Sequence, residues 1–289
     1  MAYRPCGHTG SSGRLLTRRE FVRSAGVAGL AAVMVSAAPF QPPRSFVVSR
    51  HERSLRGLDG PLRLALLTDL HLGPYLGEEE LERWVAATLR EEPDVVLLGG
   101  DLVDQRYRGD LSELARHLPR LAAPLGVYAV LGNHDHARFR RIDALTDMLA
   151  AAGVTLLAND AARLREDLVL AGIDDLRVGR PDLDATLAAA RRSGAEDGGA
   201  TALLSHNPDV IPEVPGDVDL VLAGHTHGGQ VRLPLVGAVV TSSRYGRRYL
   251  SGWVEAPMPA FVSRGLGVTG LPFRYDCPAE LAVITLLPG

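Results

Sequence analysis

Apolar and polar positions follow a block pattern over most of the chain. Short apolar runs bounded by turn-forming residues predict buried strands, and longer stretches with apolar residues at three- and four-residue spacing predict helices. The expected strands cover residues 62–66, 94–99, 127–131, 164–166, 168–173, 202–204 and 219–223, and the expected helices cover residues 78–90, 111–121, 142–152 and 183–192. Strands that alternate with helices predict an α/β fold.

The pattern changes after Gly228. Short strands are expected at residues 230–233, 249–254, 260–263 and 281–286, with turns between them. A regular α/β half followed by a strand-rich tail predicts two packed sheets with helices on the outside. We expect residues 61–289 to form a single domain.

The amino terminus predicts a targeting segment. Residues 17–23 read Thr-Arg-Arg-Glu-Phe-Val-Arg and precede an uncharged run, Ser24–Phe40, which is rich in alanine, glycine and valine. Paired arginines before an apolar run resemble the twin-arginine signal, and a small-residue cleavage site precedes Ala38. We expect residues 1–38 to direct export through the twin-arginine machinery to an extracytoplasmic, cell-wall or membrane-associated location, and residues 39–60 to be a linker. An uncleaved segment would instead anchor the protein in the membrane.

The net charge and the number of cysteines indicate which partners and which kinds of stabilisation to expect. The chain has a net charge of −3, and residues 1–38 carry five arginines and one glutamate, a net of +4, so the remainder carries −7. This acidic remainder argues against a nucleic-acid partner. The two cysteines are Cys6 and Cys277, and removal of the amino-terminal segment would leave Cys277 as a small buried thiol.

Five polar runs carry the candidate chemistry, and each follows an apolar stretch. They are Thr68-Asp69-Leu70-His71, Gly100-Asp101, Gly132-Asn133-His134-Asp135, Ser205-His206-Asn207 and Gly224-His225-Thr226-His227. In an open α/β sheet, ligands bind in the crevice beyond the carboxyl ends of the strands. One edge of the fold would therefore gather three carboxylates, an asparagine and five imidazoles. Each run alone is commonplace, but together and in this order they predict a two-metal site.

The side chains divide between two ions. Asp69 and His71 lie two residues apart, so they project from the same side of an extended chain, and Asp101 is well placed to bridge both ions. We expect one site to be completed by Asn133, His206 and His225, and the other to be closed by His227. Carboxylate, imidazole and amide ligands suit Mn, Fe or Zn better than Ca. Two such ions can hold a bridging hydroxide and the oxygens of a phosphoryl group.

Further residues are candidates for catalysis and substrate binding. His134 is not needed as a ligand and could protonate a leaving oxygen or stabilise charge there, with Asp135 fixing its tautomer and orientation. An arginine side chain can bind two phosphate oxygens at once. The candidates for substrate contacts are therefore Arg244, Arg247, Arg248 and Arg264. For each of them, the alternative that it is simply a solvated surface residue is equally plausible. Asp174 and Asp175 end an apolar strand and could reach the crevice or form a turn.

The ordered pattern D-x-H, G-D, G-N-H-D/E, H and G-H-x-H over residues 69–227 resembles the calcineurin-like metallophosphoesterase superfamily. The resemblance implies a double β-sandwich flanked by helices, an α/β-β/α four-layer fold, and hydrolysis of phosphoesters at a two-metal centre. It also implies that Asp101 is shared between the ligand sets of the two ions and that His134 is the catalytic histidine. Over residues 61–288, segments such as Phe261-Val-Ser-Arg-Gly-Leu-Gly267 and Pro272-Phe-Arg274 look like exported bacterial phosphoesterases of the UDP-2,3-diacylglucosamine pyrophosphatase-like subgroup.

The resemblance and the residues lead to one main functional hypothesis. The chain is expected to be an exported phosphoesterase that cleaves phosphodiester or pyrophosphate bonds with two divalent metal ions, Mn, Fe or Zn. Its substrate would be a lipid, a nucleotide sugar or a cell-wall polymer. Two alternatives stay open: a phosphomonoesterase, including a phosphoprotein phosphatase, and a non-catalytic metal-binding scaffold.

Overall fold

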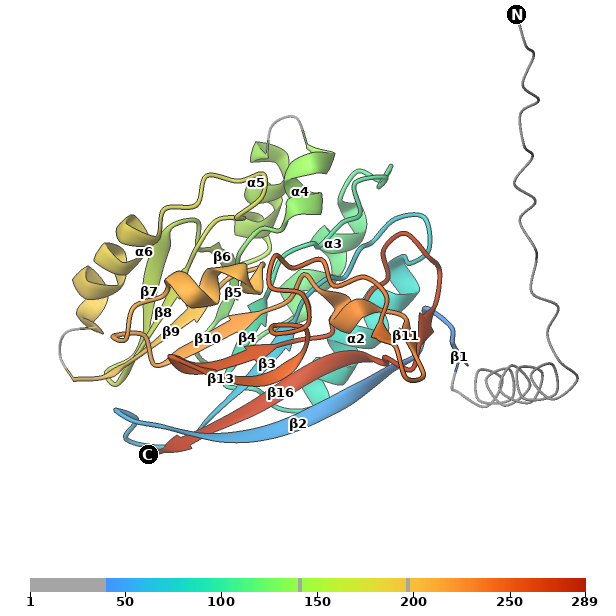
Figure 1. Ribbon diagram of the computed structural model, residues 1–289. Helices are drawn as coiled ribbons and strands as arrows, with labels where there is room; N and C mark the ends of the chain where they lie inside the picture. The colour runs from blue at the N-terminus through green and yellow to red at the C-terminus, as the bar shows by residue number, and fades with distance from the viewer. Residues whose placement is uncertain (1–39, 140–141, 196–197) are drawn as a thin grey trace, which may run out of the picture. The chain divides into compact units, whose positions relative to one another are not determined.

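Two six-stranded sheets form the centre of the molecule (Figure 1). The structure is a computed structural model and describes residues 40–139, 142–195 and 198–289. The expected signal segment, residues 1–38, and Cys6 therefore lie outside the described residues. Among the residues described, no helix combines the length and the hydrophobicity needed to cross a bilayer.

The first sheet has the strand order β2-β16-β3-β4-β5-β6. Its strands are β2 (Phe46–Leu55), β16 (Ala279–Pro288), β3 (Leu62–Leu67), β4 (Val95–Leu98), β5 (Val127–Ala129) and β6 (Val154–Leu156). The four strands from β3 to β6 are parallel, so β3, β4 and β5 end at the same edge of the sheet. Strand β16 is antiparallel to β3 and parallel to β2.

The second sheet has the strand order β13-β14-β10-β9-β8-β7. Its strands are β13 (Gly252–Ala256), β14 (Met258–Val262), β10 (Leu220–Ala223), β9 (Ala200–Leu204), β8 (Leu168–Gly172) and β7 (Asp160–Arg165). The four central strands are parallel and the two edge strands are antiparallel to their neighbours. Two small ribbons pair β1 (Phe40–Gln41) with β15 (Arg274–Tyr275) and β11 (Arg232–Leu233) with β12 (Gly237–Ala238).

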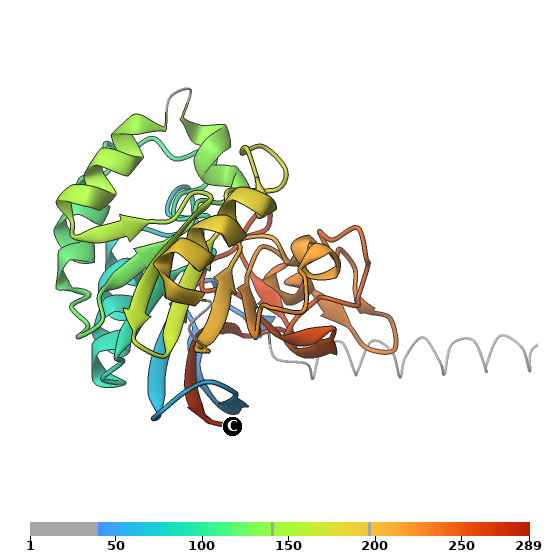
Figure 2. The same ribbon diagram turned by 90° about the vertical axis from the view of Figure 1, so that its left-hand side faces the viewer.

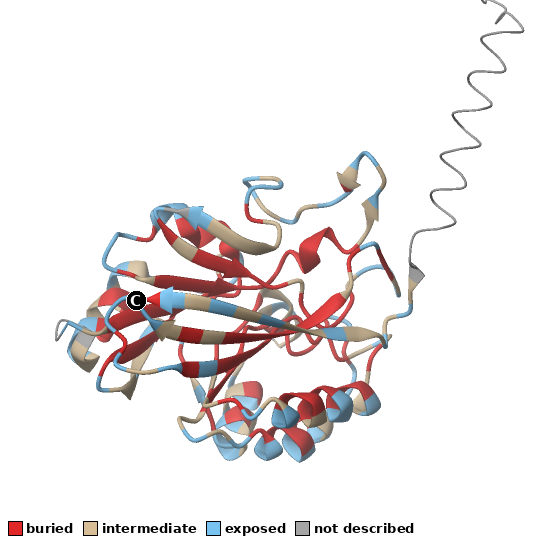
Figure 3. Ribbon diagram, turned by 90° about the horizontal axis from the view of Figure 1, so that it is seen from below, coloured by how far each residue is buried: buried red, intermediate tan, exposed pale blue. Residues whose placement is uncertain are grey.

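Helices cover the outer face of each sheet. The helical elements are α2 (Glu78–Arg90), α3 (Ser112–His117), η1 (Leu118–Arg120), α4 (Asn133–Arg138), α5 (Asp143–Ala151), α6 (Leu183–Ala190), η2 (Arg191–Ala195), η3 (Pro208–Glu213) and η4 (His227–Gly229). Helices α2, α3 and α5 pack on the first sheet, and α6 and η3 pack on the second. Figure 2 shows the helices around the sheets from a second side, and Figure 3 shows helices buried along one face and exposed along the other.

Three apolar layers hold these elements together. The middle layer lies between the sheets, where side chains such as Leu66, Leu97, Leu204 and Phe261 are buried. The strands contribute apolar residues to both faces, as expected for parallel strands covered on each side. The structure is thus the expected four-layer α/β arrangement of two sheets flanked by helices.

Local predictions succeeded where the pattern was strong. The helix expected at residues 78–90 is α2 with the same bounds, which an acidic first turn and Arg90 in the last turn favour. The expected linker is wrong over β2, because residues 46–55 form a full-length strand paired with β16. The proline, arginine and glycine content of residues 41–60 suggested an irregular segment, but the arginines of β2 lie on a partly solvated edge strand.

Candidate metal centre

The carboxyl ends of β3, β4, β5, β9 and β10 converge, and each is followed by one of the five polar runs. Backbone hydrogen bonds tie the runs together. Asp69 N donates to Gly100 O at 2.9 Å, His71 N donates to Asp101 O at 2.9 Å, and Gly224 N donates to His206 O at 3.0 Å. These bonds join the runs within each sheet, and His225 N, which donates to Asp69 Oδ2 at 3.0 Å, joins the two sets, as the position of the strand ends predicted.

Three groups of side chains in this layer could each hold a metal ion. They are Asp69, His71 and His227; His71, Asp101 and His134; and Asp101, His206 and His225. Within each group the candidate ligand atoms all lie within 4.8 Å of one another. Asp101 Oδ2 lies 3.4 Å from His71 Nε2 and 3.3 Å from His206 Nε2, so one carboxylate connects the clusters.

Imidazole nitrogens face one another within these clusters. His71 Nε2 lies 3.0 Å from His227 Nε2, and His225 Nδ1 lies 3.1 Å from His206 Nε2. Burial lowers the pKa of His71 to about 4 and that of His225 to about 3, and it lowers the pKa of His227 well below its usual value. These imidazoles are therefore neutral at neutral pH, and neutral imidazole is the form that binds metals.

The charge balance of the cluster also favours cations. Burial opposes ionisation of Asp101, but the adjacent His206 and His71 hold its pKa below the ordinary range. Burial likewise disfavours the charged form of His206, yet Asp101 and Asp69 raise the pKa of His206 to about 10. The carboxylates thus stabilise positive charge next to His206 Nε2. His206 Nδ1 lies 2.8 Å from Gly99 O, a contact that orients the ring with Nε2 toward the cluster.

A buried amide oxygen without a hydrogen-bond partner fits the role of a metal ligand. Asn133 Oδ1 is buried and makes no hydrogen bond with the described residues. A buried acceptor without a partner is costly, and an amide oxygen is a suitable ligand for a divalent ion. Asn133 begins α4 next to Gly132, where a Cβ atom would overlap the Asp101 carboxylate. Glycine at this position lets the two runs approach closely.

Strained backbone conformations are concentrated in the residues expected to bind the metals. Five of the seven expected ligands have positive φ: Asp69 at 56°, His71 at 47°, Asp101 at 51°, His225 at 70° and His227 at 52°. Such conformations cost of the order of 1–3 kcal/mol each for residues other than glycine, and they persist where the surroundings impose them. Their concentration here is typical of a functional site, and the donor set, the unpartnered amide and the strain all fit a divalent-metal centre.

The structure corrects the role expected for Asp135. Its carboxylate accepts hydrogen bonds from Gly132 N at 3.0 Å and Val103 N at 3.1 Å, so it binds the loop backbone and not His134. The carboxylate beside His134 belongs to Asp104, whose Oδ2 lies 3.7 Å from His134 Nδ1. Asp104 was missed because no strand end or short motif marked it, although it follows Asp101 by three residues.

The expected arginines occupy different environments. Arg264 forms an ion pair with Glu280 at 2.6 Å, and the Arg248 guanidinium lies 5.3 Å from the centre of the Tyr249 ring. Arg244 lines a cavity of about 530 Å³ together with Arg177, which the sequence analysis missed. Arg177 Nη1 lies 3.4 Å from His225 Nε2, so Arg177 lies directly beside one of the clusters.

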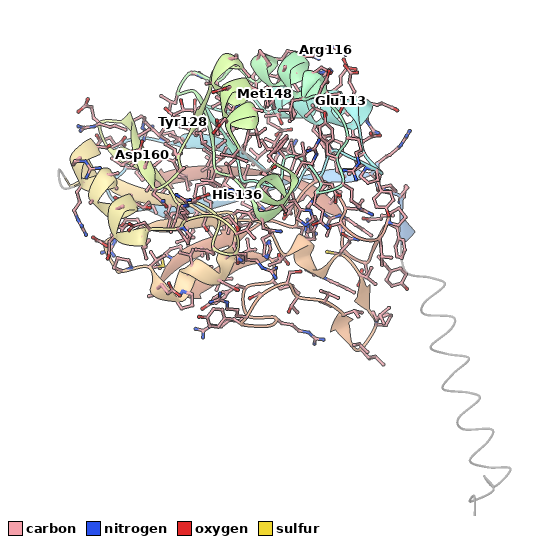
Figure 4. All side chains as sticks on the ribbon, turned by 90° about the horizontal axis from the view of Figure 1, so that it is seen from above. Glu113, Arg116, Tyr128, His136, Met148 and Asp160 are labelled. Atoms are coloured by element: carbon pink, nitrogen blue, oxygen red, sulfur yellow. The ribbon has the colours of Figure 1, made fainter. Side chains whose placement is uncertain are left out.

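The residues after β8 form a turn. Asp174 pairs with His136 at 2.8 Å between Oδ1 and Nε2, and Figure 4 labels His136. Asp175 Oδ2 accepts hydrogen bonds from Arg177 N at 2.8 Å and Val178 N at 2.7 Å. These hydrogen bonds fit the turn interpretation, and Asp175 positions Arg177. Asp175 also lies close enough to the clusters to contribute to the raised pKa of His206, so the crevice interpretation holds for this residue as well.

Two buried residues, Arg274 and Cys277, form hydrogen bonds with the backbone carbonyl of His227. Arg274 is buried, and its Nη1 donates to His227 O at 3.1 Å while Nη2 donates to Gly267 O at 2.6 Å. Burial lowers the pKa of Arg274 to about 10, so the guanidinium stays charged at neutral pH. Cys277 is a free buried thiol, as expected, and its Sγ donates to His227 O at 3.3 Å.

Comparisons with known proteins agree with this geometry. The family model described as calcineurin-like phosphoesterase matches residues 62–229. The chain is 32% identical over 238 residues to "Uncharacterized metallophosphoesterase YkuE" of Bacillus subtilis (strain 168), with 80% of each chain covered. It is 28% identical over 287 residues to "Phosphodiesterase YaeI" of Escherichia coli (strain K12), which covers 94% of this chain and 100% of that protein.

A vertebrate relative is also similar. The chain is 32% identical over 264 residues to "Transmembrane protein with metallophosphoesterase domain" of Danio rerio. That similarity covers 85% of this chain and 58% of the zebrafish protein.

Proposed function

The chain belongs to the calcineurin-like phosphoesterase family and is a metal-dependent phosphoester hydrolase, and from this premise we propose that it cleaves phosphodiester or pyrophosphate bonds with two divalent ions. The observation that carries the proposal is the position of Asp101. Its carboxylate belongs to two of the three groups that could hold a metal, so it is placed to serve two neighbouring ions.

The proposed ligand sets combine the clusters with the motif pattern of the family. Asp69, His71, Asp101 and His227 would hold one ion, and Asp101, Asn133, His206 and His225 would hold the other. This mixture of oxygen and nitrogen donors favours Mn, Fe or Zn. When bound, two such ions supply the positive charge that activates water and neutralises phosphoryl oxygens.

His134 is the proposed proton donor. It is less buried than the four histidine ligands, and its ring centre lies 4.6 Å from that of His71, so it lies beside the proposed metal ligands. The Gln105 N–H points at His134 Nδ1 at 3.3 Å, so neutral His134 carries its proton on Nε2. Proton transfer to the leaving oxygen would take place from the imidazolium form, with Nε2–H as the donor, and would leave the ring neutral. The Asp104 carboxylate, 3.7 Å from Nδ1, stabilises the positive charge that the ring carries before the transfer.

A diester substrate is favoured by the likeness to the phosphodiesterase YaeI. The test compares turnover of bis(p-nitrophenyl) phosphate and p-nitrophenyl phosphate by the full chain with Mn²⁺. We expect the diester to be cleaved with the higher kcat/KM, and His134→Ala to abolish most of that activity. Cleavage of the monoester alone would replace this proposal with a phosphomonoesterase.

The finer elements of the hypothesis are proposals of the same kind. We place the enzyme outside the cytoplasm, exported by the twin-arginine machinery, and we propose a lipid, nucleotide-sugar or cell-wall substrate. We also propose that the chain is a member of the UDP-2,3-diacylglucosamine pyrophosphatase-like subgroup. The paired arginines of residues 17–23 support export. Mass spectrometry of the native amino terminus tests it: a chain that begins near Ala38 is expected, and a chain that begins at Met1 would contradict cleavage.

A further inference from the structure

Exposed apolar side chains gather in one region that the reaction does not explain. The hairpin region, residues 231–248, contains β11, β12 and the loop that follows them. Its large exposed hydrophobic side chains are Leu233, Leu235, Val236, Val239, Val240 and Tyr245. Outside the hairpin region, the described residues show only Val47, Leu89, Val178 and Leu271 in this class. Large contiguous apolar patches on a soluble surface mark interaction sites.

The turn of the hairpin makes the exposure more informative. Leu235 is 98% exposed, and its φ is 65°. Glycine or asparagine would occupy this left-handed position at lower cost, and a leucine there gains nothing from packing inside the protein. The hairpin backbone is nevertheless fixed, because Arg247 Nη2 donates to Ala238 O at 3.2 Å and Arg232 Nε donates to Gly228 O at 2.7 Å. The hairpin backbone is thus fixed by hydrogen bonds while the apolar side chain of Leu235 is exposed to solvent.

The net positive charge of the hairpin region favours a negatively charged partner. Residues 220–254 contain four arginines, Arg232, Arg244, Arg247 and Arg248, and no acidic residue, although the whole chain carries −3. Arg244 and Arg248 are exposed beside the apolar side chains. A basic and apolar surface complements an anionic phospholipid membrane, where arginines meet the headgroups and apolar side chains enter the acyl boundary.

The patch is continuous with the candidate centre. A cavity of about 320 Å³ is lined mainly by apolar groups and reaches from Val239, Val240 and Leu271 to His227. In Figure 2 the orange segment that contains β11 and β12 projects to one side of the two sheets. We infer that the hairpin region docks on an anionic phospholipid surface, with Leu235 inserted and the cavity beside His227 facing the lipid.

The test measures binding to vesicles, so it is independent of the proposed hydrolysis. The full chain is sedimented with vesicles of phosphatidylglycerol and phosphatidylcholine, or of phosphatidylcholine alone. Asparagine tolerates positive φ, so Leu235→Asn removes the side chain without disturbing the turn. We expect Leu235→Asn to lower the partition coefficient on anionic vesicles by about tenfold or more. The matched control, Val47→Asn on β2, is expected to bind like the wild type.

A second measurement separates the hairpin from residues 1–39, which are present in every variant. Tryptophan is introduced as Leu235→Trp or Val47→Trp, and quenching by brominated acyl chains is recorded. Quenching confined to Leu235→Trp is expected. Equal binding of Leu235→Asn and wild type, or no quenching of Leu235→Trp, would overturn the inference. Leu235-dependent self-association without lipid, seen by sedimentation velocity, would instead assign the patch to a second copy of the chain.

Discussion

Replacing Asp101 with asparagine removes the charge that links the clusters while keeping the shape of the side chain. Asp101 Oδ2 lies 3.3 Å from His206 Nε2 in a fully buried site. Two unit charges at that separation attract by about 5 kcal/mol at an effective dielectric constant of ~20. Since about 1.4 kcal/mol corresponds to a factor of ten, a cation beside the neutral amide of the Asp101→Asn variant would bind about 4,000-fold less tightly.

The assay measures metal content and turnover on the same sample. After reconstitution with Mn²⁺ and gel filtration, we expect wild type to retain two ions per chain and Asp101→Asn to retain one or none. Turnover of bis(p-nitrophenyl) phosphate should fall by about a thousandfold or more. Asp160→Asn, an exposed aspartate on β7, is the control and should match wild type. Two retained ions together with undiminished turnover in Asp101→Asn would refute the shared role of Asp101.

Three further predictions concern the residues around the clusters. His134→Ala should lower kcat by about 10²–10⁴-fold while metal content, measured by mass spectrometry, stays at the wild-type value; loss of the metal would show that His134 is a ligand instead. Asp135→Ala leaves two buried N–H groups without their acceptor, so the free energy of unfolding in urea should fall by about 1–3 kcal/mol or more, whereas an unchanged value would contradict its role in holding the loops. The hydrogen bond to Asp174 raises the pKa of His136, so the stabilisation is complete below the ordinary histidine pKa of ~6.5 and is lost as pH rises through the raised value. His136→Asn should therefore lower Tm more at about pH 5.5 than at about pH 8.5, and the opposite order would reject the pairing.

Much of the centre could be predicted because the chemistry follows the strands. Parallel strands end at one edge, so polar residues after β3, β4 and β5 had to lie near one another, as did those after β9 and β10 in the second sheet. The pattern of apolar runs was enough to find these strand ends. Which residues meet across the two sheets depends on packing, and the motif pattern supplied that expectation.

The errors arose where long-range pairing or local geometry decides. Strand β2 pairs with β16 near the other end of the chain, and nothing in its own charged sequence reveals that partner. Helix α4 was missed because Asn133-His134-Asp135 reads as a turn, yet the Asp135 carboxylate accepts the Gly132 N–H and starts a helix. Asp104 lies near His134 and Arg177 lies near His225 only because of how the loops fold, so neither contact could be predicted from the sequence.

Anomalous diffraction from Mn²⁺-soaked crystals can show whether two divalent ions share the Asp101 carboxylate. If they do, the map contains two manganese peaks about 3.5–4 Å apart, both within bonding distance of Asp101, and this is the arrangement that we expect. A single peak, or two peaks that do not share Asp101, would contradict it.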